Sequence, residues 1–512
     1  MKVRAKKLAV LMLAGMLVLS GFGQTGIVNA EETTEQTEST VTQDNKKEEP
    51  DNSSEEKTED LEGEEEQTEV SGGENSKPEA EDNGDTTTSN QSAVSARALN
   101  MQVKQDPAEE AAVSMVQGET TVGSYPSIAK ALENVEDYNY STNKTEYVIT
   151  LQKDIQEDIV IPAKKKIAID LNGFKITNVS SHTIYNHSTN IRIIDQKGGG
   201  VVDNITHGKA AVYNNIKASI TLSGGSFTRS KEASTGDSAS GGNSFYVLKN
   251  FGTMTINEGV TVKFSDTNCG LFSSLIGNGW QDAAAAEAGT NGEPKPSEGN
   301  KKATLNIKGG NLYGGQITVK NDDYGNLTVS GGTIVQPSEG RAAIANNHIA
   351  KITGGQIEAQ GENGQAVYSR YFDTKGANKG ELTISGGTFK STGTVIQAQK
   401  GSNLSVTAGT FETSGEDSYI FEVQDDVTSS IKSGTYKGVT ADKVANKEDA
   451  FAEGYAPQQD KDGNIVVDVT EESTVAIATD REGNTVRYTS LSSALKNAAA
   501  GSAVSLQKDI TL

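Results

Sequence analysis

The chain has 512 residues, a formal net charge of −23 at pH 7 and a single cysteine, Cys269. The negative charge argues against a nucleic acid as partner, because phosphate backbones are recognised by Lys and Arg. One cysteine excludes a disulfide framework within the chain, so packing and backbone hydrogen bonds must stabilise the folded part.

The N-terminus is typical of an export signal. Lys2 and Lys7 precede an apolar run over 8–22, and Val28-Asn29-Ala30 has the small residues of a cleavage site. This pattern predicts a secretory signal peptide over residues 1–30. A membrane anchor is the alternative, but the run is short for a bilayer span, so we expect no membrane span in the mature chain.

An acidic segment follows. Residues 31–90 contain 22 Asp and Glu against 4 Lys, a net charge of −18, with Val41, Leu61 and Val70 as the large aliphatic residues. Such a segment cannot bury enough apolar surface to offset the entropy of ordering it. Residues 31–118 are therefore predicted to be a disordered acidic linker, either a solvated spacer or a tail that binds cations or a partner.

Residues 119–470 repeat one phrase, in which a short aliphatic strand is followed by a Gly pair and a large apolar residue. From Gly310 onward the second glycines advance in steps of 22, 23, 32 and 22. A period in the low twenties with strand character is typical of stacked coils. We predict an all-β solenoid of about ten coils with three short strands each. The copies lie at 220–227, 305–312, 327–334, 351–357, 382–389 and 404–411.

Two corners of each coil are expected to be special. The second glycine of the phrase should have a positive φ angle, which glycine adopts without strain. The third strand of several coils ends in asparagine, which tolerates sharp corners and can hydrogen-bond to the same residue of the next coil. We predict an asparagine ladder; unrelated turn residues are the alternative. These residues are Asn186, Asn214, Asn250, Asn321 and Asn346.

The start of the repeat body recurs near the C-terminus. The segment 125–132 resembles 488–495, and 151–155 recurs unchanged at 506–510. Ser127 and Ser490 each precede a short stretch of helical apolar spacing and are candidate N-caps. We predict a short helix that caps the open apolar end of the stack, and a second, truncated β-helix module over 473–512.

These motifs resemble a known family. The phrase at 382–389, the turn at 170–173 and the coil length are similar to right-handed parallel β-helix proteins of the pectate-lyase-like class. More narrowly, they resemble the β-helix modules of Gram-positive exported cell-surface proteins. The matching segments are the opening ones at 490–495, 151–155 and 171–173 and the closing ones at 451–455 and 462–466. The resemblance implies export and an extracellular or cell-wall location, and it supplies no catalytic motif.

Two clusters of polar residues are weak candidates for chemistry. Carbohydrate-active enzymes on such a fold use carboxylates from adjacent coils with a basic partner. Turn carboxylates in solvent are the alternative interpretation. His182, His187 and His207 lie close in sequence, but their spacing does not favour a zinc site. No metal or cofactor is expected. The carboxylate candidates are Asp170, Asp195 and Asp203, with Arg192 nearby.

Aromatic residues in interrupting segments are the preferred binding candidates. The period is broken at 228–243, 278–302 and 371–380, and the last two should project from the same corner. Aromatic side chains on such loops can stack on sugar rings, or instead pack against the coils. The predicted ligand-binding residues are Trp280, Tyr368, Tyr371 and Phe372.

The sequence favours an exported bacterial surface protein. Its β-helix would serve as a non-catalytic stalk or adhesive platform for extracellular glycans or for host or matrix proteins. A polysaccharide lyase or glycoside hydrolase on the same fold is the alternative. The two differ in whether carboxylates and a basic side chain converge in an open groove.

Overall fold

The computed structural model describes residues 110–142, 144–229, 245–264, 274–280, 294–295, 302–339, 341–370 and 379–510. The predicted signal peptide and almost all of the predicted acidic linker lie outside these residues, as do Cys269, Tyr371 and Phe372. Within the described part of the chain, no helix is long and apolar enough to cross a bilayer.

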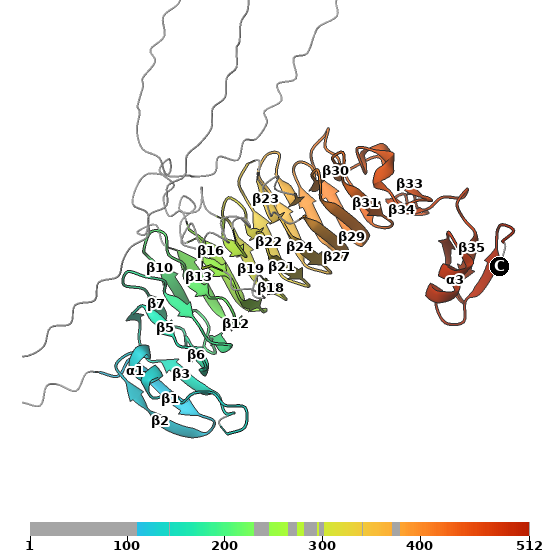
Figure 1. Ribbon diagram of the computed structural model, residues 1–512. Helices are drawn as coiled ribbons and strands as arrows, with labels where there is room; N and C mark the ends of the chain where they lie inside the picture. Colours follow the sequence, from blue (N-terminus) through green and yellow to red (C-terminus); the bar gives the residue numbers. More distant parts are fainter. Residues whose placement is uncertain are drawn as a thin grey trace, which may run out of the picture. The chain divides into compact units, whose positions relative to one another are not determined.

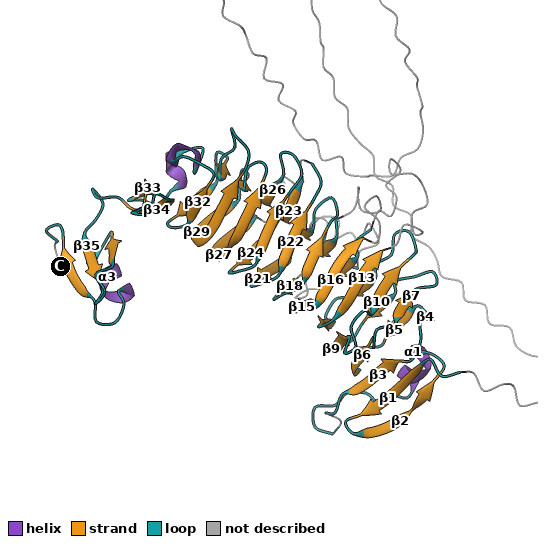
Figure 2. Ribbon diagram, turned by 180° about the vertical axis from the view of Figure 1, so that it is seen from behind, coloured by secondary structure: helices purple, strands orange, loops and turns teal. Residues whose placement is uncertain are grey.

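Most of the regular structure is β-strand, arranged in three stacks of parallel strands (Figures 1 and 2). The chain visits the stacks in turn and then returns beside its starting strand, so each circuit makes one coil. The long parallel sheets are compatible with a β-helix or solenoid and confirm a β-rich repeat.

The first stack comes before the glycine pair in each coil. Its inward residues are aliphatic and in register, for example Ile169 beside Ile193 and Leu305 beside Leu327. The strands are β3 (Tyr147–Leu151), β6 (Lys166–Asp170), β9 (Asn190–Ile194), β12 (Ser219–Leu222), β15 (Thr253–Ile256), β18 (Ala303–Ile307), β21 (Gly325–Val329), β24 (Ile349–Ile352), β27 (Glu381–Ser391), β29 (Asn403–Thr413) and β31 (Thr428–Ile431).

The second stack follows the glycine pair. In the last coils β27 and β29 run through the corner and contribute to both stacks. The other strands are β4 (Ile155–Gln156), β7 (Lys175–Thr177), β10 (Val201–Asn204), β13 (Gly225–Arg229), β16 (Val260–Phe264), β19 (Asn311–Tyr313), β22 (Thr333–Gln336), β25 (Gln356–Ala359) and β32 (Thr435–Lys437).

The third stack is a separate sheet of ten strands, in agreement with the expected number of coils. Its strands are β5 (Ile159–Ile161), β8 (Ile184–Asn186), β11 (Val212–Asn214), β14 (Leu248–Asn250), β17 (Ile276–Asn278), β20 (Val319–Asn321), β23 (Ala342–Asn346), β26 (Gln365–Ser369), β28 (Ile396–Ala398) and β30 (Phe421–Val423).

The two predicted corners are present. Gly332 has a φ of +84°, and a Cβ there would lie 2.7 Å from the carbonyl oxygen of Gly309 in the preceding coil. Only glycine fits both the dihedral angle and the close approach. Gly355 in turn stacks on the Gly331–Gly332 backbone, so the pairs line up along one corner.

The asparagine ladder is confirmed, and it is longer than predicted. Each side-chain amide donates from Nδ2 to Oδ1 of the next asparagine at 2.7–2.8 Å, and the last donates to the Ser369 hydroxyl at 3.1 Å. All members are fully buried, so these bonds form where no water competes. Asn278, inside an interrupting segment, was not recognised from the sequence. The ladder runs through Asn186, Asn214, Asn250, Asn278, Asn321 and Asn346.

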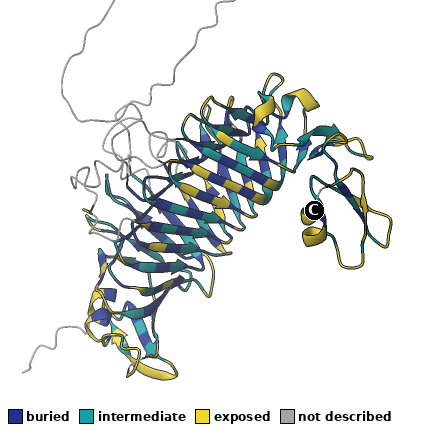
Figure 3. Cartoon of the chain, turned by 45° about the vertical axis from the view of Figure 1, so that its right-hand side comes forward, coloured by how far each residue is buried: buried dark blue, intermediate teal, exposed yellow. Residues whose placement is uncertain are grey.

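The ladder ends before the last coils. Beyond Ser369 the equivalent positions are Ala398 and Val423. In the second stack of these coils, the Phe411 ring stacks between Phe389 at 4.9 Å and Tyr436 at 5.5 Å. Figure 3 shows the buried residues running along the strands through the whole stack.

The first coil is covered by a small antiparallel unit, here called the first cap, made of β1, β2, α1 and β3. β1 (Val113–Gln117) lies between β2 (Thr120–Tyr125) and β3, and it begins before the expected domain start at 119. Helix α1 (Ile128–Glu133) is N-capped by Ser127, as predicted, and contacts β1, β2 and β5.

The other end is closed by a hairpin. β33 (Tyr455–Gln459) pairs with β34 (Ile465–Val469), which in turn pairs antiparallel with β32. Two 3-10 turns precede it, η3 (Ala441–Lys443) and η4 (Glu448–Ala450). A second small sheet follows, formed by β35 (Ala476–Thr479), β36 (Thr485–Tyr488), α3 (Leu491–Asn497) and β37 (Ala503–Leu506).

Candidate functional site

The outer face of the third stack brings together charged and aromatic side chains from successive coils. The central residue of a strand in this stack points away from the core, because its two neighbours are buried in it. Parallel register then aligns the central residues in a column along the stack. Between β8 and β26 the column reads Tyr185, Tyr213, Lys249, Gly277, Lys320, Ala345 and Tyr368.

Two of the predicted interrupting segments leave from the end of this stack. β17 ends at Asn278 and β26 ends at Ser369, directly before the segments at 278–302 and 371–380. The starting points agree with the expectation of a shared corner. Most of both segments lies outside the described residues.

Trp280 is buried in a small apolar cluster on this face. Its ring centroid lies 5.0 Å from that of Phe251 and 6.0 Å from that of Tyr324. The indole Nε1 donates to the carbonyl oxygen of Pro294 at 2.8 Å. The ring thus packs against the coils, which was the alternative to stacking on sugar rings. Ligand binding by the ring would require the cluster to open. A role for Trp280 in binding stays a prediction.

Tyr368 lies farther along the same column and is half-buried. Its hydroxyl donates to Oε1 of Gln399 at 2.8 Å, and the Arg370 guanidinium lies 5.4 Å from the ring centroid. Two of the four predicted aromatic residues lie within the described part of the chain. Of these two, Tyr368 has part of its surface open to solvent, whereas Trp280 is buried.

A charged network lies between these two aromatic residues. Lys320 Nζ is 3.1 Å from Asp322 Oδ1, and Asn347 Nδ2 donates to the same oxygen at 3.0 Å. Arg370 Nε donates to Oδ1 of Asn347 at 2.8 Å. Asp322 and Asn347 are fully buried, and Arg370 is 8% exposed. The network therefore links three coils through charge-assisted hydrogen bonds.

The charge on Lys320 is stabilised by its carboxylate neighbour. Burial by itself would lower the pKa of Lys320, but Asp322 outweighs that effect and raises the pKa well above its usual value. Lys320 therefore keeps its positive charge at neutral pH. Removing either partner of such a pair lowers the stability of the fold, because the remaining charge would be buried alone.

A second lysine on the face is also enclosed. Lys249 is 1% exposed, donates to the carbonyl oxygen of Gly279 at 2.9 Å, and lies 4.6 Å from the ring centroids of Tyr246 and Phe251. The Tyr246 ring occupies the space above Gly277, where a Cβ would come within 2.6 Å of it. The ammonium is thus held by a carbonyl and by aromatic faces.

This arrangement only half meets the requirements of a carbohydrate-active site. A carboxylate and basic groups do converge, as an acid–base mechanism needs. The carboxylate is nevertheless buried and paired, so in this conformation it does not face an open groove. No group of three or more His, Cys, Asp or Glu within the described residues is placed to hold a metal ion.

The sequence contains one signal related to this network, but that signal is not sufficient to find it. Asp322, Asn347 and Arg370 each follow directly after a ladder residue, so the ladder aligns them in space. To recognise that these three residues occupy the same position in successive coils, one must know where each coil begins and ends. The interrupting segments make these boundaries difficult to read from the sequence.

Two of the candidate carboxylates hold turns. Asp170 Oδ1 accepts the backbone N–H of Gln196 at 3.1 Å, and Asp195 Oδ1 accepts that of Gly173 at 2.9 Å. Each carboxylate therefore fastens one coil to the next at the turn after the first stack. Both carboxylates thus serve turns, as in the alternative interpretation, but Asp170 is 4% exposed and therefore not in solvent.

The remaining members of that group are also paired. Asp203 lies 2.9 Å from Lys175 Nζ and accepts the Thr228 hydroxyl at 2.7 Å. Arg192 lies in β9 of the first stack, and its Nε donates to Glu146 at 2.9 Å. The four side chains do not converge on one site.

Two of the three histidines pack among aromatic rings at the start of the outer face. His182 Nδ1 accepts the N–H of Ala210 at 2.9 Å, and its ring lies 4.5 Å from that of Tyr213. Burial lowers the pKa of His182 to about 3. The His187 ring lies 4.2 Å from Tyr185, and burial lowers its pKa as well.

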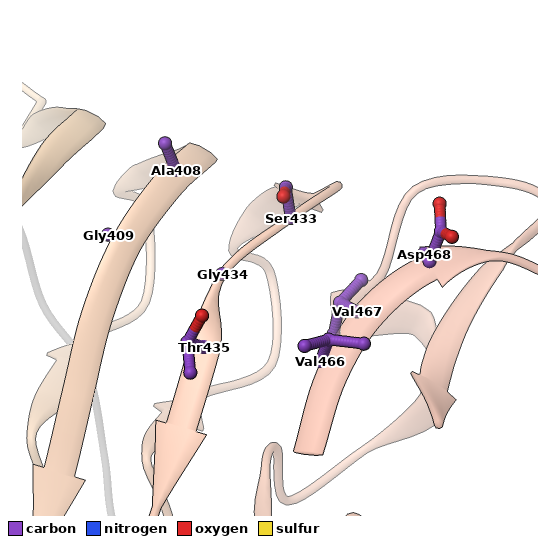
Figure 4. A pocket seen from close by; sticks show the side chains of 8 residues that line it. All are labelled: Ala408, Gly409, Ser433, Gly434, Thr435, Val466, Val467 and Asp468. Atoms are coloured by element: carbon purple, nitrogen blue, oxygen red, sulfur yellow. The ribbon is translucent and has the colours of Figure 1, made fainter. Parts of the chain in front are cut away.

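Two hollows lie along the glycine corner. One of about 350 Å³ separates the last coils from β34 and is shown in Figure 4. Another of about 370 Å³ includes Glu258, Lys308 and the Gly309–Gly310 pair. Neither lining contains the paired acidic groups that hydrolysis of a glycosidic bond requires. The residues of the first are Ala408, Gly409, Ser433, Gly434, Thr435, Val466, Val467 and Asp468.

Comparisons with protein-family models, with curated proteins and with solved structures find no match to this chain. Function must therefore be argued from the outer face itself. Its main feature is a set of charged and aromatic groups that bind one another across coils.

Proposed function

We propose that the chain is an exported, non-catalytic surface protein of the pectate-lyase-like, right-handed parallel β-helix type, serving as a stalk or adhesive platform. The observation that supports this is the enclosure of the polar groups on the third stack. Lys249, Lys320 and Asp322 are held by partners within the protein rather than directed at a groove.

The same groups give the fold the rigidity that a stalk needs. The buried asparagine ladder and the charged network connect successive coils from β8 to β26 without disulfides. A protein exposed outside the cell benefits from such cross-links, because local opening is the route to proteolysis. The sequence motifs shared with Gram-positive surface modules support the same location.

The adhesive surface would be the outer face of the third stack, with an extracellular glycan or a host or matrix protein as ligand. Tyr368 offers a partly open ring beside the Arg370 guanidinium, a combination suited to sugar rings and to acidic groups. Trp280, Tyr371 and Phe372 remain proposed contributors next to it.

Binding can be tested with arrays of glycans and matrix proteins probed with the chain from residue 31 onward. We expect Tyr368→Ala to weaken binding at least about tenfold, equivalent to ~1.4 kcal/mol. The matched control is Tyr313→Ala, because Tyr313 is 47% exposed on the second stack. Equal binding by both variants would exclude Tyr368 as a ligand contact; equal binding by the control and a Tyr368→Ala/Tyr371→Ala/Phe372→Ala variant would exclude the outer face of the third stack as the adhesive surface.

The location can be tested separately. Expressed in a Gram-positive host, the full chain should reach the medium or the cell wall, and a chain lacking residues 1–30 should stay in the cytoplasm. Retention of both in the cytoplasm would contradict export.

A polysaccharide lyase or hydrolase is the second candidate, favoured by the meeting of Asp322, Lys320 and Arg370. Polysaccharides would be screened for new reducing ends and for unsaturated products. Turnover that disappears in a folded Lys320→Met/Asp322→Asn double variant would establish the enzyme and refute a non-catalytic role.

A further inference from the structure

The small sheet at the C-terminus repeats the first cap in its hydrogen-bond register. In the first cap, Val113 pairs with both Tyr125 and Leu151. In the second sheet, Ala476 pairs with Tyr488 and Leu506 in the same way. We call β35, β36, α3 and β37 the second cap.

The matching extends to the helix and its connections. Ser490 Oγ accepts the backbone N–H of Ser493 at 3.1 Å, as Ser127 Oγ accepts that of Lys130 at 3.1 Å. The second cap is therefore a folded copy of the first, and equivalent residues can be compared one by one.

The two caps differ in the burial of two leucines. Leu132 of helix α1 is 6% exposed, whereas its equivalent Leu495 is 68% exposed. Leu151 is fully buried, whereas its equivalent Leu506 is 50% exposed. Ala476 pairs with Leu506 and therefore lies on the same face of the sheet, yet it is fully buried. That face is thus closed at β35 and open at Leu506, where the first cap buries the equivalent Leu151.

The first cap shows what covers this face. Strand β6 pairs with β3 in parallel, with Tyr147 beside Ile167 and Ile149 beside Ile169. Helix α1 contacts β5 of the same coil. In the second cap, β37 pairs with β35, and among the described residues its other edge has no strand beside it.

A second contact in the first cap comes from the same coil. The Glu157 carboxylate accepts the backbone N–H groups of Ile128 and Ala129 at 2.9 and 2.7 Å, at the start of helix α1. Orphan amides at a helix N-terminus favour an acidic partner. The coil therefore binds the cap through a strand edge, an apolar face and a helix end.

We propose that the second cap is a docking surface for a solenoid coil, which pairs in parallel with β37 and covers Leu495 and Leu506. The occupant is a coil that resembles residues 158–177 of this chain: it has a strand in which aliphatic residues alternate with others, followed by a turn. Its strand would pair with 502–505 as Ile167–Asp170 pair with Tyr147–Thr150 in the first cap.

The surface suits this occupant because an exposed strand edge invites a parallel or antiparallel partner, and Leu495 and Leu506 favour an apolar one. A generic hydrophobic ligand would leave the β37 backbone groups unpaired. A coil satisfies both requirements together, as it does in the first cap.

The test uses the chain from residue 31 to 512, alone and extended by a copy of its own residues 158–469. Because 151 and 506 are equivalent, residue 158 continues the second cap in register. Hydrogen exchange measured by mass spectrometry would follow the amides of β37. We expect exchange there to slow on the order of 100-fold in the extended chain, toward the rate of β3.

Two controls keep the result interpretable. Leu506→Asp should abolish the protection in the extended chain and change little in the unextended one, because the side chain is half exposed there. An extension of the same composition in shuffled order should give no protection. Exchange of β3 in the same molecules reports whether the first stack is folded.

Two outcomes would overturn the proposal. Equal exchange of β37 with and without the ordered extension would show that no coil docks. A dimer of the unextended chain that Leu506→Asp dissociates would assign the face to a second copy of the protein instead. Neither outcome affects adhesion by the third stack, so this inference fails or holds independently of the proposed function.

Discussion

Asn250 in the middle of the asparagine ladder is the most informative residue to remove. Its Nδ2 donates to Asn278 at 2.7 Å and to the Thr304 carbonyl at 3.0 Å, and its Oδ1 accepts from Asn214 at 2.7 Å and from the Gly252 amide at 3.2 Å. Four hydrogen bonds at about 1 kcal/mol each, in a site closed to water, predict that Asn250→Ala lowers the free energy of unfolding by about 3–5 kcal/mol.

The loss can be measured by equilibrium unfolding in urea. The single tryptophan, Trp280, is buried two residues from the ladder and reports on these coils by fluorescence, while circular dichroism reports on all strands. With a slope of about 3–4 kcal/mol per molar urea for a domain of this size, the midpoint should fall by roughly 1 M. The comparison is valid where both signals change together.

Asn311→Ala is the matched control, because Asn311 is an exposed asparagine in the second stack. It makes the same chemical change outside the ladder and should alter the free energy of unfolding by less than about 0.5 kcal/mol. If Asn250→Ala is no more destabilising than this control, the ladder does not stabilise the stack and the reasoning is refuted.

Three further predictions concern packing, charge and pH. Phe411→Ala should cost about 3–5 kcal/mol of unfolding free energy, because Phe411 is fully buried in the aromatic stack; a cost below about 1 kcal/mol in urea unfolding would contradict that role. Lys320→Met should cost about 3–5 kcal/mol by leaving Asp322 buried without its ammonium partner, and adding Asp322→Asn should restore much of it; additive losses would show that the two side chains are not coupled. Burial keeps the pKa of His182 near 3, below its ordinary 6.5, so the unfolded chain binds more protons between these values and stability should fall as the pH drops through this range. His182→Gln should remove roughly 2 kcal/mol of that loss between pH 6.5 and 5 in urea titrations, and an unchanged pH profile would show that the ring is not buried in the neutral form.

The surroundings of Trp280 could not be derived from the sequence. Trp280 was predicted to bind a ligand because it lies in an interrupting segment, and that role stays a prediction; the structure shows its ring beside Phe251 and Tyr324. An aromatic residue in a loop can face solvent or pack on a neighbouring surface, and the choice depends on what that surface offers. Here the third stack offers aromatic rings from other coils.

The sequence by itself determined the coil. Its period, the glycine at one corner and the asparagine at another are properties of about 22 consecutive residues, so local pattern predicted the strands, the positive φ angles and most of the ladder. The helix N-caps at Ser127 and Ser490 were predicted for the same reason, since a cap depends on its own first turn.

Only the tertiary structure decided which side chains meet between coils. Asp322, Asn347 and Arg370 form one network because parallel register places them side by side, while segments of different length separate the coils along the chain. Burial of Leu132 and exposure of Leu495, in nearly the same local sequence, have the same origin. A side chain's surroundings are set by the next coil, and no pattern within its own coil contains that information.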